Sequence, residues 1–214
     1  MKFLIWTRPV AAWFVYWLFK LGILRTWYRL YRELYERKHF DPDSPEFTHL
    51  ARYHTIAELV AEIGKAKWRA DKFKELWDAI SHPSAIQYRL NTDPSKFIGD
   101  CDEFAVYSAA VINNESKLLN ELGAVRAYIM SVMWIKTGGK TWAGNSLGYG
   151  GHNVCVIQLI NGKFKWMDYG IPTNADSLND VASQVRNMYA TQYYTLGWAL
   201  QDATSLKLIS ASRD

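Results

Sequence analysis

The segment Gly99-Asp100-Cys101-Asp102-Glu103-Phe104-Ala105 has the signals of a helix start. Asp100 suits the N-cap position, and Glu103, three residues later, suits the returning half of a capping box. Apolar residues then follow at helical spacing, namely Phe104, Ala105, Ala109, Val111 and Ile112. We therefore expect Cys101 to be the first residue of a helix around which the fold is organised.

Cys101 is a candidate nucleophile because of this position. Unpaired backbone N–H groups and the positive end of the helix dipole favour the thiolate, which is the nucleophilic form of cysteine. Gly99 leaves room for the backbone of a substrate to approach. The alternative is that Cys101 is simply a small apolar residue in a well-capped helix.

Partners for a cysteine nucleophile follow along the chain. Such a nucleophile needs a histidine as proton acceptor and a third group that orients the imidazole. His152 is the one histidine after Cys101, and a β-branched segment typical of a strand follows it. Asn161-Gly162 predicts a turn, and residues 163–170 predict the returning strand, on which Asp168 is the candidate orienting carboxylate.

The register of this hairpin decides whether His152 and Asp168 can meet. A two-residue turn pairs residues whose numbers sum to 323 and puts the two side chains on opposite faces of the sheet. A three-residue loop, Ile160-Asn161-Gly162 with a left-handed glycine, pairs residues whose numbers sum to 322. His152 and Asp168 then lie diagonally on one face, together with the aromatic side chains. We predict the three-residue loop.

Three motifs in this order, GDCDEFA, GHNV and WMDYG, resemble those of the transglutaminase-like cysteine peptidases of bacteria and their phages. That family is a branch of the papain-like superfamily, and the resemblance covers roughly residues 55 to 175. It implies a triad of Cys101, His152 and Asp168. It also implies an α+β fold in which the cysteine begins a central helix packed on an antiparallel sheet.

The resemblance also implies residues that bind the oxyanion and the substrate. The backbone N–H of Cys101 is one candidate oxyanion donor, and the side chain of Gln87 is another. Trp142 and Gly151 belong to a glycine-rich segment, residues 136–151, that we expect to form a loop bordering the site. No cofactor or metal is expected, because the sequence has neither CxxC nor HExxH spacing.

The two cysteines exclude a disulfide framework. Cys155 lies an odd number of residues from His152 and should face the other side of its strand, as a buried structural thiol. The alternative, a Cys101–Cys155 disulfide, would block the proposed chemistry.

Residues 1–40 differ from residues 41–214 in composition. They contain eight Lys or Arg against two Glu, and the apolar part of the segment is rich in aromatic residues. We expect one long helix that binds a membrane or a partner protein through residues 10–38, joined by the linker 41–45. No nucleic-acid-binding motif is present. A membrane-associated or virion assembly in a reducing compartment fits these features.

The remaining segments are assigned from periodicity and turn signals. We expect helices at residues 46–54, 55–63 and 66–80, an irregular segment at 81–98, and a strand at 124–135. The C-terminal part should contain a helix at 178–189, an element at 193–200 and a strand at 206–209.

The sequence thus predicts a cysteine hydrolase that cleaves an amide bond of a peptide or protein through a thioester. Two alternatives stay open. One is a structural component of a phage particle or membrane-associated assembly with an accessory or inactive peptidase-like module. The other is an acyltransferase of the transglutaminase type, since a triad alone does not separate hydrolysis from transfer.

Overall fold

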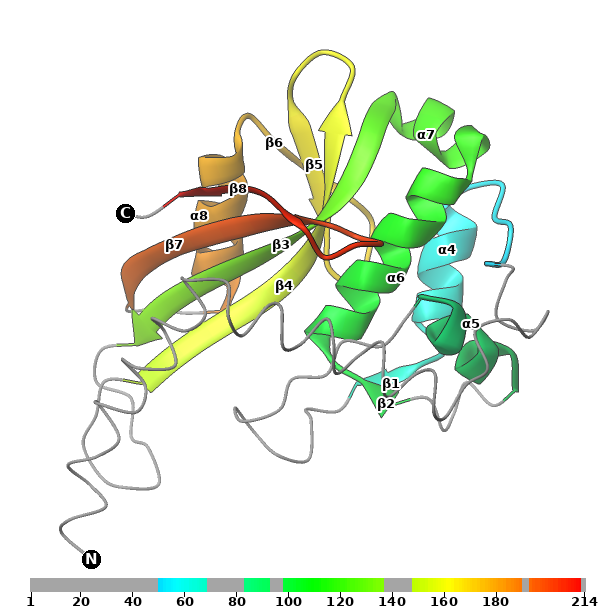
Figure 1. Cartoon of the computed structure of the whole chain (residues 1–214), viewed down its shortest axis with the longest axis horizontal. Helices are drawn as coiled ribbons and strands as arrows, with labels where there is room; N and C mark the ends of the chain where they lie inside the picture. Colours follow the sequence, from blue (N-terminus) through cyan, green and yellow to red (C-terminus); the bar gives the residue numbers. More distant parts are fainter. Residues whose placement is uncertain (1–49, 69–82, 93–97, 137–147, 190–192, 213–214) are drawn as a thin grey trace, which may run out of the picture.

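A computed structural model describes residues 50–68, 83–92, 98–136, 148–189 and 193–212 of the 214-residue chain. The predicted N-terminal helix, the linker and Trp142 lie outside these residues. The described part has an α+β fold with one six-stranded antiparallel sheet, in the order β6-β5-β4-β3-β7-β8 (Figure 1). The strands are β3 (Ala124–Lys136), β4 (Gly148–Leu159), β5 (Phe164–Met167), β6 (Thr173–Ala175), β7 (Tyr193–Asp202) and β8 (Leu208–Ser212).

Five helices belong to the described residues: α4 (Ile56–Ile63), α5 (Pro83–Thr92), α6 (Cys101–Asn114), α7 (Ser116–Leu122) and α8 (Leu178–Tyr189). Helix α6 packs on one face of the sheet and α8 on the other (Figure 1). The first core joins α4, α6 and α7 to sheet residues that include Cys155 and Ile157. The second core joins α8 to the opposite face, which includes Val154, Val156 and Trp166.

Helix α6 begins where the sequence predicts. Asp100 Oδ1 accepts a hydrogen bond from the backbone N–H of Asp102 at 3.1 Å, and Glu103 Oε2 accepts one from the N–H of Asp100 at 3.1 Å. The capping box is therefore confirmed. It makes Cys101 the first helical residue.

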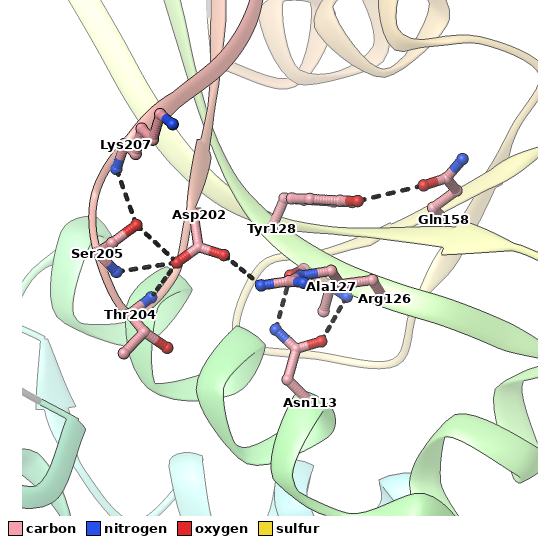
Figure 2. A network of polar contacts seen from close by, with 9 residues as sticks. All are labelled: Asn113, Arg126, Ala127, Tyr128, Gln158, Asp202, Thr204, Ser205 and Lys207. Atoms are coloured by element: carbon pink, nitrogen blue, oxygen red, sulfur yellow. Dashed lines mark hydrogen bonds and ion pairs between the residues drawn. The ribbon is translucent and has the colours of Figure 1, made fainter.

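The other end of α6 is tied to the sheet. The Asn113 amide donates to the carbonyl of Ala127 at 2.8 Å and accepts from its N–H at 2.7 Å, as a neighbouring strand would (Figure 2). Arg126 pairs with Asp202 at the end of β7, and Tyr128 bonds Gln158 on β4 (Figure 2). The two bonds of Asn113 therefore fix the C-terminal end of α6 against β3.

The hairpin of β4 and β5 has the predicted three-residue loop. Cys155 pairs with Met167 and Val156 with Trp166, so the paired numbers sum to 322. The N–H of Leu159 donates to the carbonyl of Lys163 at 2.9 Å, and this bond closes the loop Ile160-Asn161-Gly162. Gly162 has φ 81°, in the left-handed region. The register puts Asp168 across from Val154, diagonal to His152.

Two predicted helices are wrong in their described parts. Residues 50–54 are not helical. The backbone N–H of Ala51 donates to Gln87 at 2.8 Å and the Tyr53 hydroxyl lies 2.9 Å from that of Tyr107, so tertiary contacts hold this segment across α5 and α6. The helix expected at 66–80 is contradicted at its start, where β1 (Lys67–Trp68) pairs in parallel with β2 (Ile98–Gly99). Such a non-local pairing leaves no periodic signal in the sequence.

Two segments expected to be irregular are regular. Residues 83–92 form α5, in which Pro83 occupies the first helical position, where proline needs no backbone hydrogen bond. Residues 148–151 belong to β4 rather than to a loop, because they pair with the extended end of β3, residues 133–136. The predicted helix at 178–189 matches α8, and the segments at 193–200 and 206–209 fall within or beside β7 and β8.

Candidate active site

Cys101 lies half-buried at the N-terminus of α6. Its Sγ is 3.5 Å from Oδ1 of Asp102, and the carboxylates of Asp100 and Glu103 belong to the same turn. These acidic groups oppose a thiolate and offset part of what the helix dipole contributes. An imidazolium partner would therefore matter more for Cys101 than for a cysteine without such neighbours.

Cys155 is placed very differently. It is completely buried in the core against α6, and burial raises the pKa of its thiol. Cys101 and Cys155 form no disulfide in the structure. The predicted structural role of Cys155 agrees with this burial.

His152 and Asp168 are brought together as the register predicts. Nε2 of His152 is 3.0 Å from Oδ1 of Asp168, and the two side chains are 10% and 7% exposed. The separation is that of an ion pair, and the angle at the ring nitrogen departs from that of a hydrogen bond. Nε2 faces the carboxylate, so Nδ1 is the nitrogen on the side of the ring turned away from Asp168.

Two tyrosines surround this pair. The ring of Tyr189 lies 4.0 Å from that of His152, at 34°, and its hydroxyl donates to Oδ2 of Asp168. The ring of Tyr169 packs edge-on against Phe104 at 4.7 Å. Its buried hydroxyl has no hydrogen-bond partner among the described residues. Tyr169 has φ 52°, a left-handed conformation that is strained for a tyrosine.

The thiol of Cys101 lies within electrostatic range of both tyrosines. Burial raises the pKa of Tyr169, and the negative charges of Cys101 and Asp168 raise it further. Burial, the hydrogen bond to Asp168 and the charges of Asp168 and Cys101 raise the pKa of Tyr189. Both hydroxyls therefore stay protonated at neutral pH and remain hydrogen-bond donors.

A direct bond links the cysteine turn to the histidine strand. The side-chain amide of Asn153 donates to Oδ1 of Asp102, whose side chain is buried. Asn153 follows His152, and Asp102 follows Cys101, so this bond holds the backbones of the two candidate catalytic residues close together. The sequence motifs contain both residues but gave no reason to pair them.

The faces of β4 constrain how the thiol reaches the imidazole. Neighbouring residues of a strand point to opposite faces, so His152 shares the face of Val154 and Val156 while Asn153 points toward α6. Strand β5 ends at Met167, opposite Cys155. In the described residues no strand therefore lies beside His152 on that edge of β4. A thiol on the α6 side of β4 could therefore reach His152 only around this edge.

Gln87 is buried within the helical core. Its Oε1 accepts from the Tyr107 hydroxyl and from the N–H of Ala51, and its Nε2 donates to Asn91 at 2.9 Å. Tyr107 lies six residues after Cys101, roughly 9 Å along the helix axis. These contacts give Gln87 a structural role that joins α5 to α6. Its predicted role as an oxyanion donor stays a prediction.

Gly151 is exposed on β4, opposite Met133, next to His152. A Cβ at this position would meet the carbonyl oxygen of Val132 at 3.4 Å, a tight but ordinary contact. Its substrate role stays a prediction.

One group of described residues has metal-ligating atoms close together. Oxygen atoms of Asp100 and Asp102 and Sγ of Cys101 all lie within 4.8 Å of one another. The Asp100 carboxylate already caps α6, and the Asp102 carboxylate already accepts from Asn153. These contacts give the group a structural explanation within the helix N-terminus.

The sequence matches no protein-family model and no curated protein, and the fold matches no solved structure. Within the described ranges no helix is both long and apolar enough to cross a membrane. Function is therefore inferred from the residues of the site.

Proposed function

We propose that residues 41–214 form a papain-like cysteine hydrolase domain that cleaves an amide bond of a peptide or protein. The observation that supports this most is the ion pair of His152 and Asp168, 3.0 Å long, on a strand that the Asn153–Asp102 bond joins to the first turn of α6. An orienting carboxylate on one imidazole nitrogen leaves the other nitrogen as a base for a nucleophile. Cys101, at the helix N-terminus, is that nucleophile.

The reaction needs only this chain's residues and water. His152 takes the thiol proton through Nδ1, and Sγ of Cys101 attacks the carbonyl carbon of the substrate. The C–N bond breaks as His152 returns the proton to the leaving amine, and an acyl thioester remains on Cys101. Water then attacks the thioester with its proton passing to His152, and the carboxylic acid product leaves as the thiol is restored.

The tetrahedral intermediate develops negative charge on the former carbonyl oxygen, and hydrogen-bond donors must meet it. The backbone N–H of Cys101, at the first position of α6, is one donor. The hydroxyl of Tyr169 is a second candidate, because it is protonated, within electrostatic range of Cys101 and without a partner among the described residues.

The N-terminal segment would direct this domain to its substrate. We propose that residues 10–38 bind a membrane surface or a partner protein, because they combine aromatic and basic side chains. Hydrolysis is favoured over transfer to an amine, and addition of a primary amine to the assay would distinguish them by its incorporation into product.

The test of an activated cysteine is the pH dependence of iodoacetamide alkylation in the full-length folded protein, followed at each cysteine by mass spectrometry. Cys101 should react with a midpoint below that of an ordinary thiol, about 8.5, and His152→Ala should move the midpoint upward. Cys155 should stay inert, since it is fully buried.

His54→Ala is the matched control, because His54 is an exposed histidine whose Nδ1 lies 3.1 Å from Nζ of Lys117. It should leave the profile of Cys101 unchanged. If the native protein and His152→Ala gave the same profile, the proposal of a Cys-His pair would be wrong.

A further inference from the structure

Tyr189 contacts both members of the His152–Asp168 pair. Its ring lies against the imidazole at 4.0 Å, and its hydroxyl donates to Oδ2 of Asp168 while Oδ1 faces His152. No sequence motif singled this residue out. It is the last residue of α8, on the sheet face that His152 shares.

Helix α8 gives Tyr189 a fixed position. Val181 and Val185 are fully buried against the sheet. Two tryptophans of the sheet donate ring N–H bonds to this helix, Trp166 to Gln184 at 2.8 Å and Trp198 to Asn179 at 2.7 Å. The side chain at the C-terminal end of α8 is therefore delivered by a well-anchored element.

Asp168, in contrast, lies just beyond the end of β5 and before the left-handed residue Tyr169. Strand pairing therefore does not hold it in place. The hydroxyl of Tyr189 supplies a donor to the oxygen that His152 does not use, and so limits rotation of the carboxylate. The exposed fractions agree with this covering role, since Tyr189 is 38% exposed and the two side chains beneath it are 10% and 7% exposed.

We propose that Tyr189 is a positioning residue that holds Asp168 and His152 in the arrangement needed to activate Cys101. This inference rests on the proposed hydrolase function. With Tyr189 holding Asp168 beside Nε2, the negative charge of the carboxylate favours the imidazole tautomer that carries its proton on Nε2, and Nδ1 is then the proton acceptor. Its ring also excludes water from one side of the ion pair, which strengthens the electrostatic interaction.

The variants Tyr189→Phe and Tyr189→Leu separate the hydroxyl from the ring. Tyr128→Phe is the matched control, because Tyr128 is a half-buried tyrosine of the same sheet whose hydroxyl also bonds a side chain, Gln158, away from the site (Figure 2). All three are made in the full-length protein. Far-ultraviolet circular dichroism verifies that each is folded.

Two readouts are used. The first is the rate of Cys101 alkylation across pH. The second is the tautomer of His152, measured from its ring nitrogens by NMR and assigned by comparison with His152→Ala. Hydrogen bonds to charged groups are stronger than those between neutral groups, so Tyr189→Phe should lower the rate of Cys101 alkylation at pH 6 about tenfold or more. It should also reduce the Nε2–H population, and Tyr189→Leu should do both to a greater extent.

Tyr128→Phe should match the native protein in both readouts. If Tyr189→Phe also matched the native protein in both readouts, the inference would be overturned. The proposed function would still stand if His152→Ala slowed the alkylation of Cys101. If alkylation of the native protein did not depend on His152, the proposed function would fail. The tautomer measurement would then still decide whether Tyr189 positions the imidazole.

Discussion

Oδ1 of Asp168 lies 3.0 Å from Nε2 of His152. This contact is on one face of β4, and Asn153, which bonds Asp102 of α6, is on the other. The hairpin register produces this contact, because it puts Asp168 diagonal to His152 rather than on the other face. The candidate site is thus formed by the end of β5, its partner strand β4, the start of α6 and the end of α8.

Removing the carboxylate of Asp168 should weaken the activation of Cys101. Asp168→Ala leaves the imidazolium without its charge partner, so alkylation of Cys101 at pH 6 should fall at least about tenfold. Asp168→Asn keeps an oxygen atom beside His152, so the alkylation rate of Cys101 should fall less in this variant. The measurement is the second-order rate with iodoacetamide. Equal rates for native protein and Asp168→Ala would contradict a role for this carboxylate.

The bond between Asn153 and Asp102 should matter for stability and for the placement of Cys101. Asn153→Ala removes a donor from a buried carboxylate, which should cost about 1–3 kcal/mol in the free energy of unfolding. Asn153→Asp places two carboxylates in contact. Because that contact raises the pKa of such a pair, the loss should be larger at pH 7 than at pH 4.5. Urea unfolding at both pH values measures it.

Asn174→Ala is a suitable comparison, since Asn174 is an exposed asparagine on the edge strand β6. It should change the free energy of unfolding little. If the loss in the free energy of unfolding of Asn153→Asp were the same at both pH values, direct contact between residue 153 and Asp102 would be contradicted.

Gly162 should stabilise the three-residue loop of the hairpin. Its φ of 81° is strained for a residue with a Cβ, although no atom lies within 4 Å of where that Cβ would be. Gly162→Ala should therefore cost about 1–2 kcal/mol from backbone strain alone. Gly162→Asn should cost less, because asparagine tolerates the left-handed conformation. Thermal and urea unfolding compare the two variants, and equal losses would contradict the strain argument.

Asp202 should contribute stability that disappears in acid. Although burial opposes its charge, hydrogen bonds from Ser205, Arg126 and Thr204 hold the pKa of Asp202 below its ordinary value (Figure 2). A pKa lower in the folded than in the unfolded chain means that the carboxylate stabilises the fold above about pH 4. That contribution is lost as the pH falls through the folded pKa.

Asp202→Asn should thus lower the free energy of unfolding by about 1–3 kcal/mol at pH 7, and the difference from the native protein should shrink below about pH 4. Urea unfolding at pH 7, 5 and 3.5 measures it. The exposed ion pair of Lys163 and Asp176 offers a control, since Asp176→Asn should have little effect at any of these pH values. A difference at Asp202 that stayed constant with pH would contradict the role of the charge.

Local chemistry made several parts of this structure predictable. The capping box of α6 needs only Asp100 and Glu103, three residues apart. The hairpin register follows from the turn residues and the alternation of side chains, which is why the meeting of His152 and Asp168 could be predicted. Helix α8 matches its predicted bounds because its apolar spacing is regular.

Contacts between distant segments were not predictable in this way. Helix α5 begins with Pro83, a residue type that also suits a turn, and the strand of Lys67–Trp68 exists through its pairing with Ile98–Gly99. The predictions for both segments were wrong because packing against α6, or pairing with another strand, outweighs the local preference of the residues.

Local patterns in the sequence were enough to predict where α6 starts, that His152 and Asp168 share one face of the hairpin, and that Cys155 is buried, since each depends on residues a few positions apart. The folded arrangement was needed to show that Asn153 reaches Asp102 and that Tyr189, from the far end of α8, covers His152 and bonds Asp168. These contacts join segments far apart in the chain. Their geometry arises from how α6 and α8 pack on opposite faces of one sheet, which no local pattern encodes.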